Sequence, residues 1–222
     1  MLWYKGWLET RVGRLISLGF LGFVLGSLYS LRTPVAGLVV LATGFVMVIY
    51  TMLAGAGIAA RPPFRATKGS TLFTLSLPVT RFRLLAIRAG LGWLEMAGGL
   101  GLLCCGMWLL SPVVRATVTG FEMFEYAGTL TACASALYFL SVLLATFLDA
   151  RWRMVVGYMA FGALWWLSNH TPLPASLDII RAMNEGSPLI ARTMPWTAMG
   201  VSLALAAILF FAALKVAQAR EY

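Results

Sequence analysis

Few residues in this chain have the types and spacing that catalysis requires. The sequence contains a single histidine, His170, next to the loop "TPLP". A metal hydrolase needs several histidine and acidic ligands at defined spacing, and the zinc-protease pattern HExxH does not occur. The ATP-binding pattern GxxxxGK(S/T) does not occur either. We therefore interpret His170 as a membrane-boundary residue, expect no ATP hydrolysis by this chain alone, and assign no catalytic, cofactor or metal site.

One carboxylate stands where its charge is costly. Glu95 lies in the apolar stretch "LGWLEMAGG", about three turns into a predicted membrane-spanning helix. Such a carboxylate must face protein or water, because lipid cannot solvate it. Arg88 shares its helix face but lies about 10 Å away along the axis, which is long for a direct ion pair. Glu95 then either lines a path or an inter-subunit contact, or makes a structural hydrogen bond to a neighbouring helix.

The composition indicates that lipid is the solvent of this chain. Of its 222 residues, 60% are hydrophobic and only 11% are charged, whereas a soluble domain has about 25% charged residues. The net charge of +9 is better explained by membrane orientation than by nucleic-acid binding. Cys104, Cys105 and Cys133 fall in apolar stretches, which favours packing over a disulfide framework.

The hydrophobic pattern predicts an all-α integral membrane protein with six transmembrane helices in residues 15–222. A span needs about 20 apolar residues, and all nine prolines lie at the edges of the predicted spans or between them. The predicted spans are residues 15–32, 34–59, 84–110, 126–148, 154–169 and 197–217. With the N-terminus in the cytoplasm, thirteen of the 17 basic residues lie inside. Cytoplasmic loops collect Lys and Arg, so we predict that both termini are cytoplasmic.

The first fourteen residues form a separate element. Trp3, Tyr4, Trp7 and Leu8 follow the spacing of one helical face, and Trp and Tyr favour the headgroup region. We predict an amphipathic helix on the cytoplasmic leaflet. The alternative is a cytoplasmic extension of the first span.

Glycines recur in the first predicted span. Gly22 and Gly26 form a GxxxG pattern, and Gly19 precedes them on the same segment. Small residues four apart let helix backbones approach closely. These three glycines are therefore predicted to pack against a helix, either within the chain or across a dimer.

The predicted cytoplasmic loop at residues 60–83 contains a short amphipathic segment. Gly69 interrupts the regular structure of the preceding segment. Ser70 or Thr71 can cap a new helix, and Pro78 prevents that helix from continuing. The apolar positions between them are Leu72, Phe73, Leu75 and Leu77. This surface is too short to span a bilayer. It is either a solvated loop with lipid-facing leucines or a short helix that docks a partner and transmits its motion into the membrane.

This loop resembles the first intracellular loop of ABC-2 type permeases, the membrane subunits of type V ABC transporters. The resemblance is carried by "GSTLFTLSLPVTRFRLL" and, at the start of the chain, by "MLWYKGWLETR", which resembles some bacterial members. The interfacial helix, the six spans and a longer external segment before the last span agree with it. The basic stretch "RPPFRATK" departs from it, because many members place an acidic residue upstream of the loop helix.

The resemblance implies a transport subunit driven by other chains. Two permeases, identical or paralogous, would form the path, and two cytoplasmic ATPase subunits would bind ATP and Mg²⁺. Helix 71–77 would dock on the ATPase, the first and fifth spans would meet across the dimer, and residues 171–196 would form an outer, partly re-entrant cap. The chain would be a multi-pass protein of the inner (plasma) membrane, in contact with lipid, exporting a hydrophobic or amphipathic substrate.

Two other classes of function stay open. One is an ATP-independent secondary transporter or channel, for which Glu95 is the only candidate midplane site. The other is a membrane-embedded enzyme or a scaffold, although polar residues do not cluster inside the spans as an enzyme would need.

Overall fold

The computed structural model describes residues 81–148, 150–171, 174, 177–183 and 186–219. The predicted interfacial helix, the first two predicted spans with their three glycines, and the predicted coupling residues 69–78 lie outside the described residues.

Every element in this described part is a helix. The seven helices are α4 (Arg81–Leu110), α5 (Pro112–Thr117), α6 (Gly120–Phe147), α7 (Ala150–His170), α8 (Ile179–Met183), α9 (Pro188–Ala191) and α10 (Trp196–Ala219).

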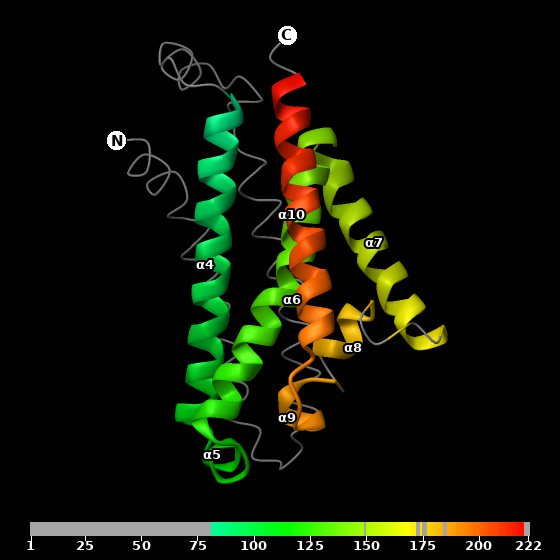
Figure 1. Cartoon of the computed structure of the whole chain (residues 1–222). Helices are drawn as coiled ribbons and strands as arrows, with labels where there is room; N and C mark the ends of the chain where they lie inside the picture. Colours follow the sequence, from blue (N-terminus) through cyan, green and yellow to red (C-terminus); the bar gives the residue numbers. More distant parts are fainter. Residues whose placement is uncertain (1–80, 149, 172–173, 175–176, 184–185, 220–222) are drawn as a thin grey trace.

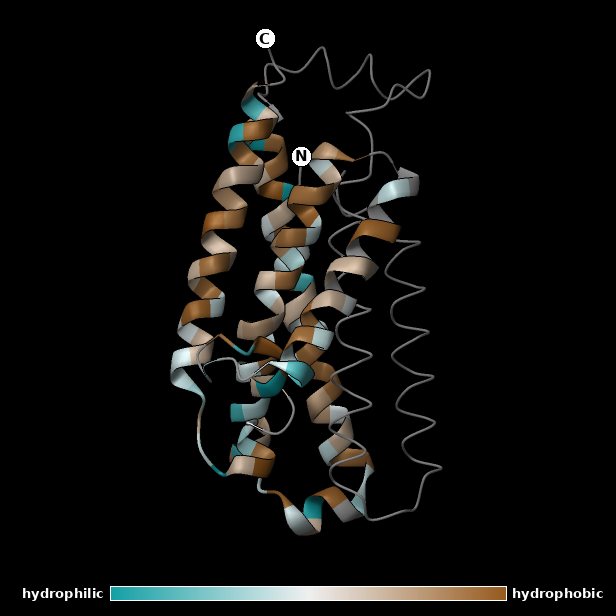
Figure 2. Ribbon diagram, turned by 90° about the vertical axis from the view of Figure 1, so that its right-hand side faces the viewer, coloured by the Kyte–Doolittle hydropathy of each residue, from teal (hydrophilic) through white to brown (hydrophobic). Residues whose placement is uncertain are grey.

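Three of these helices, α4, α6 and α10, are long and apolar enough to cross a membrane. Figure 2 shows that apolar residues dominate along their lengths. The prediction of an all-helical membrane protein is confirmed at this level. The helix α7 occupies the fifth predicted span but is not among the three, so its crossing of the membrane stays a prediction.

The helix ends follow local capping chemistry. Ser111 caps α5, whose first residue is Pro112, and Thr119 and Glu122 form a capping box at the start of α6. The proline has no N–H to leave unsatisfied there, and the box satisfies two backbone donors at once. Because of this box, α6 begins six residues before the predicted start at 126.

The helix α6 lies at the centre of the bundle (Figure 1) and packs most extensively against α10 and then against α4. We call the contact between α6 and α10 the seam. Both helices bury small residues: Ala132, Ala134 and Ala136 on α6, and Ala198, Ser202 and Ala206 on α10. Side chains of this size let two helix backbones approach closely.

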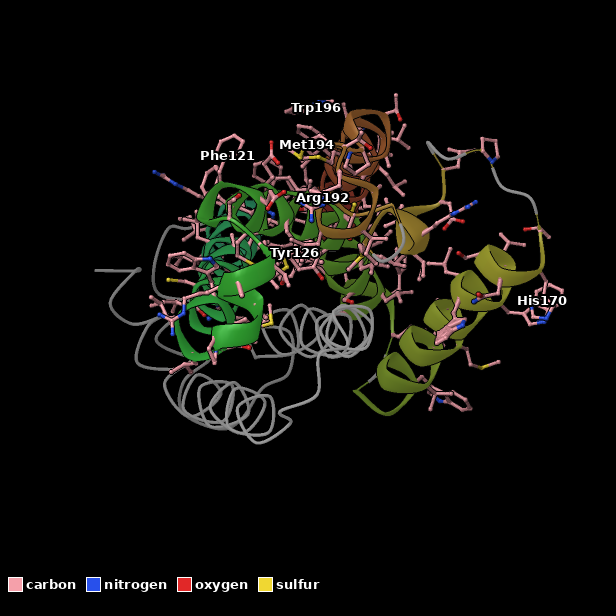
Figure 3. All side chains as sticks on the ribbon, turned by 90° about the horizontal axis from the view of Figure 1, so that it is seen from below. Phe121, Tyr126, His170, Arg192, Met194 and Trp196 are labelled. Atoms are coloured by element: carbon pink, nitrogen blue, oxygen red, sulfur yellow. The ribbon has the colours of Figure 1, made fainter. Side chains whose placement is uncertain are left out.

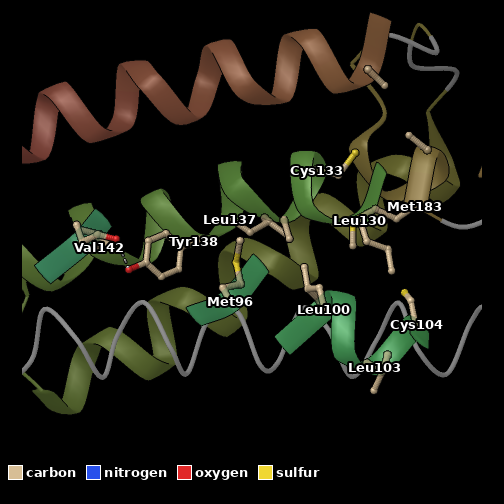
Figure 4. Close-up of a cluster of buried hydrophobic side chains, with 14 of the residues drawn as sticks. Met96, Leu100, Leu103, Cys104, Leu130, Cys133, Leu137, Tyr138, Val142 and Met183 are labelled. Atoms are coloured by element: carbon tan, nitrogen blue, oxygen red, sulfur yellow. Dashed lines mark hydrogen bonds between the residues drawn. The ribbon is translucent and has the colours of Figure 1, made fainter. Parts of the chain in front are cut away.

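The helix α4 packs on the other side of α6 through a stripe of buried apolar side chains, most of them large. Leu85, Ala89, Met96, Leu100 and Leu103 recur three, four or seven residues apart and are all buried. This spacing places them on one helical face, and Figure 4 shows several of them against residues of α6.

The helix α7 leaves this bundle at an angle (Figure 1) and packs mainly against α6 and α8. Large apolar side chains along it, including Trp152, Met159 and Trp166, are more than half exposed. The chain returns from α7 to α10 through residues 177–183 and 186–195, which carry α8 and α9.

Candidate functional site

The two intramembrane residues singled out in the sequence both lie on α4. Arg88 and Glu95 are half-buried and flank the stripe that packs on α6. The Glu95 carboxylate interacts electrostatically with Tyr138 of α6. Glu95 is therefore near Tyr138 at the α4–α6 contact, and both alternatives for its role stay predictions.

Two hydrogen bonds cross the same α4–α6 interface. The Trp93 indole N–H donates to Ser135 Oγ at 2.7 Å, and the Tyr138 hydroxyl donates to the Ala89 carbonyl at 3.0 Å. Tyr138 is fully buried. These bonds and Glu95 form a polar band across an otherwise apolar contact.

Sequence reasoning missed Trp93, Ser135 and Tyr138. The only available signal was the recurrence of hydroxyl residues along the fourth predicted span, and that signal does not say which helix they face. The Ser135 hydroxyl also donates to the Thr131 carbonyl at 2.6 Å. Since both hydroxyls are engaged, this band fixes the register of α4 on α6 and offers no activated nucleophile.

Metal chemistry has no support in the described residues, where no three His, Cys, Asp or Glu side chains form a group that could hold an ion. His170 lies in the last turn of α7, stacked on Trp166 with ring centroids 4.9 Å apart. Its Nδ1 lies 3.0 Å from the carbonyl oxygen of Trp166. The interpretation of His170 as a membrane-boundary residue stays a prediction.

A second polar group joins α7 to α8. Asp178 is buried, and its Oδ1 accepts hydrogen bonds from Ser168 Oγ at 2.7 Å and from the backbone N–H of Arg181 at 2.9 Å. The carboxylate thus caps α8 and ties it to the end of α7. Within α8, Ala182 and Met183 are buried while Arg181 is exposed.

A third group lies where α6 begins and α10 approaches it. Arg192, which follows α9, donates from Nη1 to Oε1 of Glu122 in the first turn of α6. Figure 3 looks onto this end of the molecule and shows Phe121, Arg192, Met194 and Trp196 gathered there, while His170 lies apart. Phe121 and Trp196 are strongly exposed, as aromatic residues in a headgroup region are.

Comparisons with known proteins add no assignment to this geometry. No protein-family model matches the chain, and no curated protein or solved structure is significantly similar to it.

Proposed function

We propose that this chain is the membrane-spanning permease subunit of an ABC transporter that exports a hydrophobic or amphipathic substrate. Separate cytoplasmic ATPase subunits, which bind ATP and Mg²⁺, dock on residues 71–77. Both termini lie in the cytoplasm, the membrane is the cell's inner (plasma) membrane, and a second copy or paralogue completes the path.

The observation that carries this proposal is the continuity of α4. This helix runs without a break for 30 residues from Arg81, which is about 45 Å. Its described part starts three residues after Pro78, the predicted end of the docking helix. A movement of residues 71–77 would therefore act close to one end of the continuous helix α4.

Packing connects α4 to the other long helices. The buried stripe and the two hydrogen bonds tie α4 to α6, and α6 in turn packs on α10. A tilt of α4 at the cytoplasmic surface would therefore displace α6, and through α6 also α10. Coupling between a docked ATPase and a membrane path needs this kind of mechanical connection.

The exposure of α7 supports a second permease copy. Its large apolar side chains lack cover from the other described helices, and the resemblance places the fifth span at a dimer contact. In this proposal the partner permease covers part of α7 and lipid covers the rest.

A secondary transporter or channel is the second candidate function. The polar band at Glu95 and Tyr138 favours it, because ionisable groups in a span often mark ion or proton pathways. It predicts transport that continues without ATP and without a copurifying ATPase.

Copurification separates the two functions. Phe73→Asp should reduce ATPase binding at least tenfold, because a charge in a docking contact must be desolvated without a partner. Thr74→Asp is the matched control, since it adds the same charge at a polar position of the same short helix and should bind nearly normally.

The measurement is the amount of ATPase that copurifies with the tagged permease, together with ATP hydrolysis in the reconstituted complex. Normal binding and hydrolysis by both Phe73→Asp and Leu77→Asp would remove the docking helix from the proposal and favour the secondary transporter.

A further inference from the structure

We propose that residues 192–195, which we call the strap, form a releasable closure over one end of the α6–α10 seam. The latch of this closure is the ion pair between Arg192 and Glu122. The inference concerns the fold of this end of the bundle and does not depend on the proposed transport function.

The strap lies over buried residues of α6. Met194 Sδ is 3.8 Å from Thr129 Oγ1, and Met199 Sδ, in the first turns of α10, is 3.7 Å from the same atom. Thr129 and nearby Tyr126 are fully buried. Figure 3 labels Arg192, Met194 and Tyr126 at this end of the molecule. Removing the strap would therefore take away one of the two methionine side chains that lie against Thr129.

The segments on either side of the strap are anchored. Before it, Ser187 and Pro188 are buried and Asp178 holds the start of α8. After it, Ala198 of α10 is buried, and α10 packs on α6. Motion at this end would consequently be confined to the segment between Pro188 and Ala198, which contains the strap.

The latch itself is open to water. The Arg192 side chain is 63% exposed and that of Glu122 is 22% exposed. Ion pairs of this kind are weak and are screened by salt. Arg192 also has φ 56°, the only positive φ of a non-glycine residue in the described part of the chain. Because this left-handed conformation is unfavourable for arginine, contacts such as the latch must hold it.

The two oxygens of Glu122 have separate tasks. Oε2 accepts from the backbone N–H and the hydroxyl of Thr119 at 2.8 and 3.0 Å, which caps α6. Oε1 accepts from Arg192. A glutamine can serve the capping box as well, so Glu122→Gln removes the charge of the latch while α6 keeps its cap. Arg192→Asn is the complementary variant, because asparagine tolerates the left-handed conformation.

Thiol modification measures whether the seam opens. The reporter is Thr129→Cys, beneath the strap, in the full-length chain with the three native cysteines replaced by alanine. A parallel protein keeps only native Cys133, which is buried one turn further along α6. Both are reacted with a water-soluble maleimide in lipid nanodiscs, with and without the latch variants.

We expect Glu122→Gln and Arg192→Asn each to raise the modification rate at Thr129→Cys by about two- to fivefold, the size expected for an exposed ion pair. Cys133 should react at an unchanged slow rate, and Arg192→Lys should restore slow reaction at the reporter. Raising the salt to about 1 M should speed the reporter in the parent but not in Glu122→Gln, because salt screens only an existing pair.

Two results would overturn the inference. Equal reporter rates in the parent and in both latch variants would show that the ion pair does not hold the strap. A parallel rise at Cys133 would show that the whole bundle loosens, so that no local closure exists.

Discussion

The helices α6 and α7 follow one another in the chain, and yet they pack very differently. The helix α6 has buried residues along almost its whole length, while α7 exposes large apolar side chains along much of its own. The run from Ala132 to Ala136 in α6 contains only alanine, cysteine and serine, whereas α7 carries Trp152, Trp165 and Trp166.

This contrast shows that apolarity alone does not make a helix pack in a membrane. Lipid is as apolar as leucine, so burying a large aliphatic side chain against another helix gains little over leaving it in lipid. Close approach of backbones and complementary polar groups decide which helices associate. The helix α6 has both features. On α7, Ser168 at the end of the helix bonds to Asp178.

The most severe test of this contrast enlarges a small residue in the bundle. Ala134 is fully buried on α6, so Ala134→Leu should destabilise the packed bundle by about 1–3 kcal/mol. The matched control is Ala163→Leu on α7, where the position is exposed and the effect should lie within about 0.5 kcal/mol. Unfolding in bicelles, followed by tryptophan fluorescence, measures both. Equal losses of stability would contradict the contrast.

A smaller effect is expected from the polar band. Tyr138→Phe removes the hydroxyl that donates to the Ala89 carbonyl and should destabilise the α4–α6 contact by roughly 0.6 kcal/mol, as for other hydrogen bonds between membrane helices. Trp93→Phe and Ser135→Ala, made singly and together, complete a double-mutant cycle across the second bond. Additive losses in this cycle would mean that the Trp93–Ser135 bond contributes nothing to the contact.

The smallest effect is expected on α7 itself. Met159 is 69% exposed, so Met159→Ala should change the free energy of unfolding of the isolated chain by less than about 0.5 kcal/mol. If a second permease covers α7, the same substitution should instead weaken the assembled complex, which analytical ultracentrifugation in detergent can measure. A large loss of stability in the isolated chain would show that α7 is covered within the molecule.

The sequence by itself predicted the helical membrane class and the position of the long helices. The third and sixth predicted spans, 84–110 and 197–217, lie within α4 and α10 and differ from them by at most three residues at either end. Apolar length is a local property, and the prolines and arginines at the ends of a span are local signals too. Even the early start of α6 was readable, since Thr119 and Glu122 have the spacing of a capping box.

Only the tertiary structure decided which helices face one another. Glu95 was identifiable as a costly charge, but Tyr138 lies 43 positions away, and nothing local to either residue selects the other. The pairing of Glu122 with Arg192, 70 positions apart, depends in the same way on how α6 meets α10. The physical reason is that lipid solvates every apolar helix favourably, so apolarity does not select a neighbouring helix. The neighbours of a helix are chosen by small residues and polar groups that match across a contact, and that match exists only once the helices are assembled.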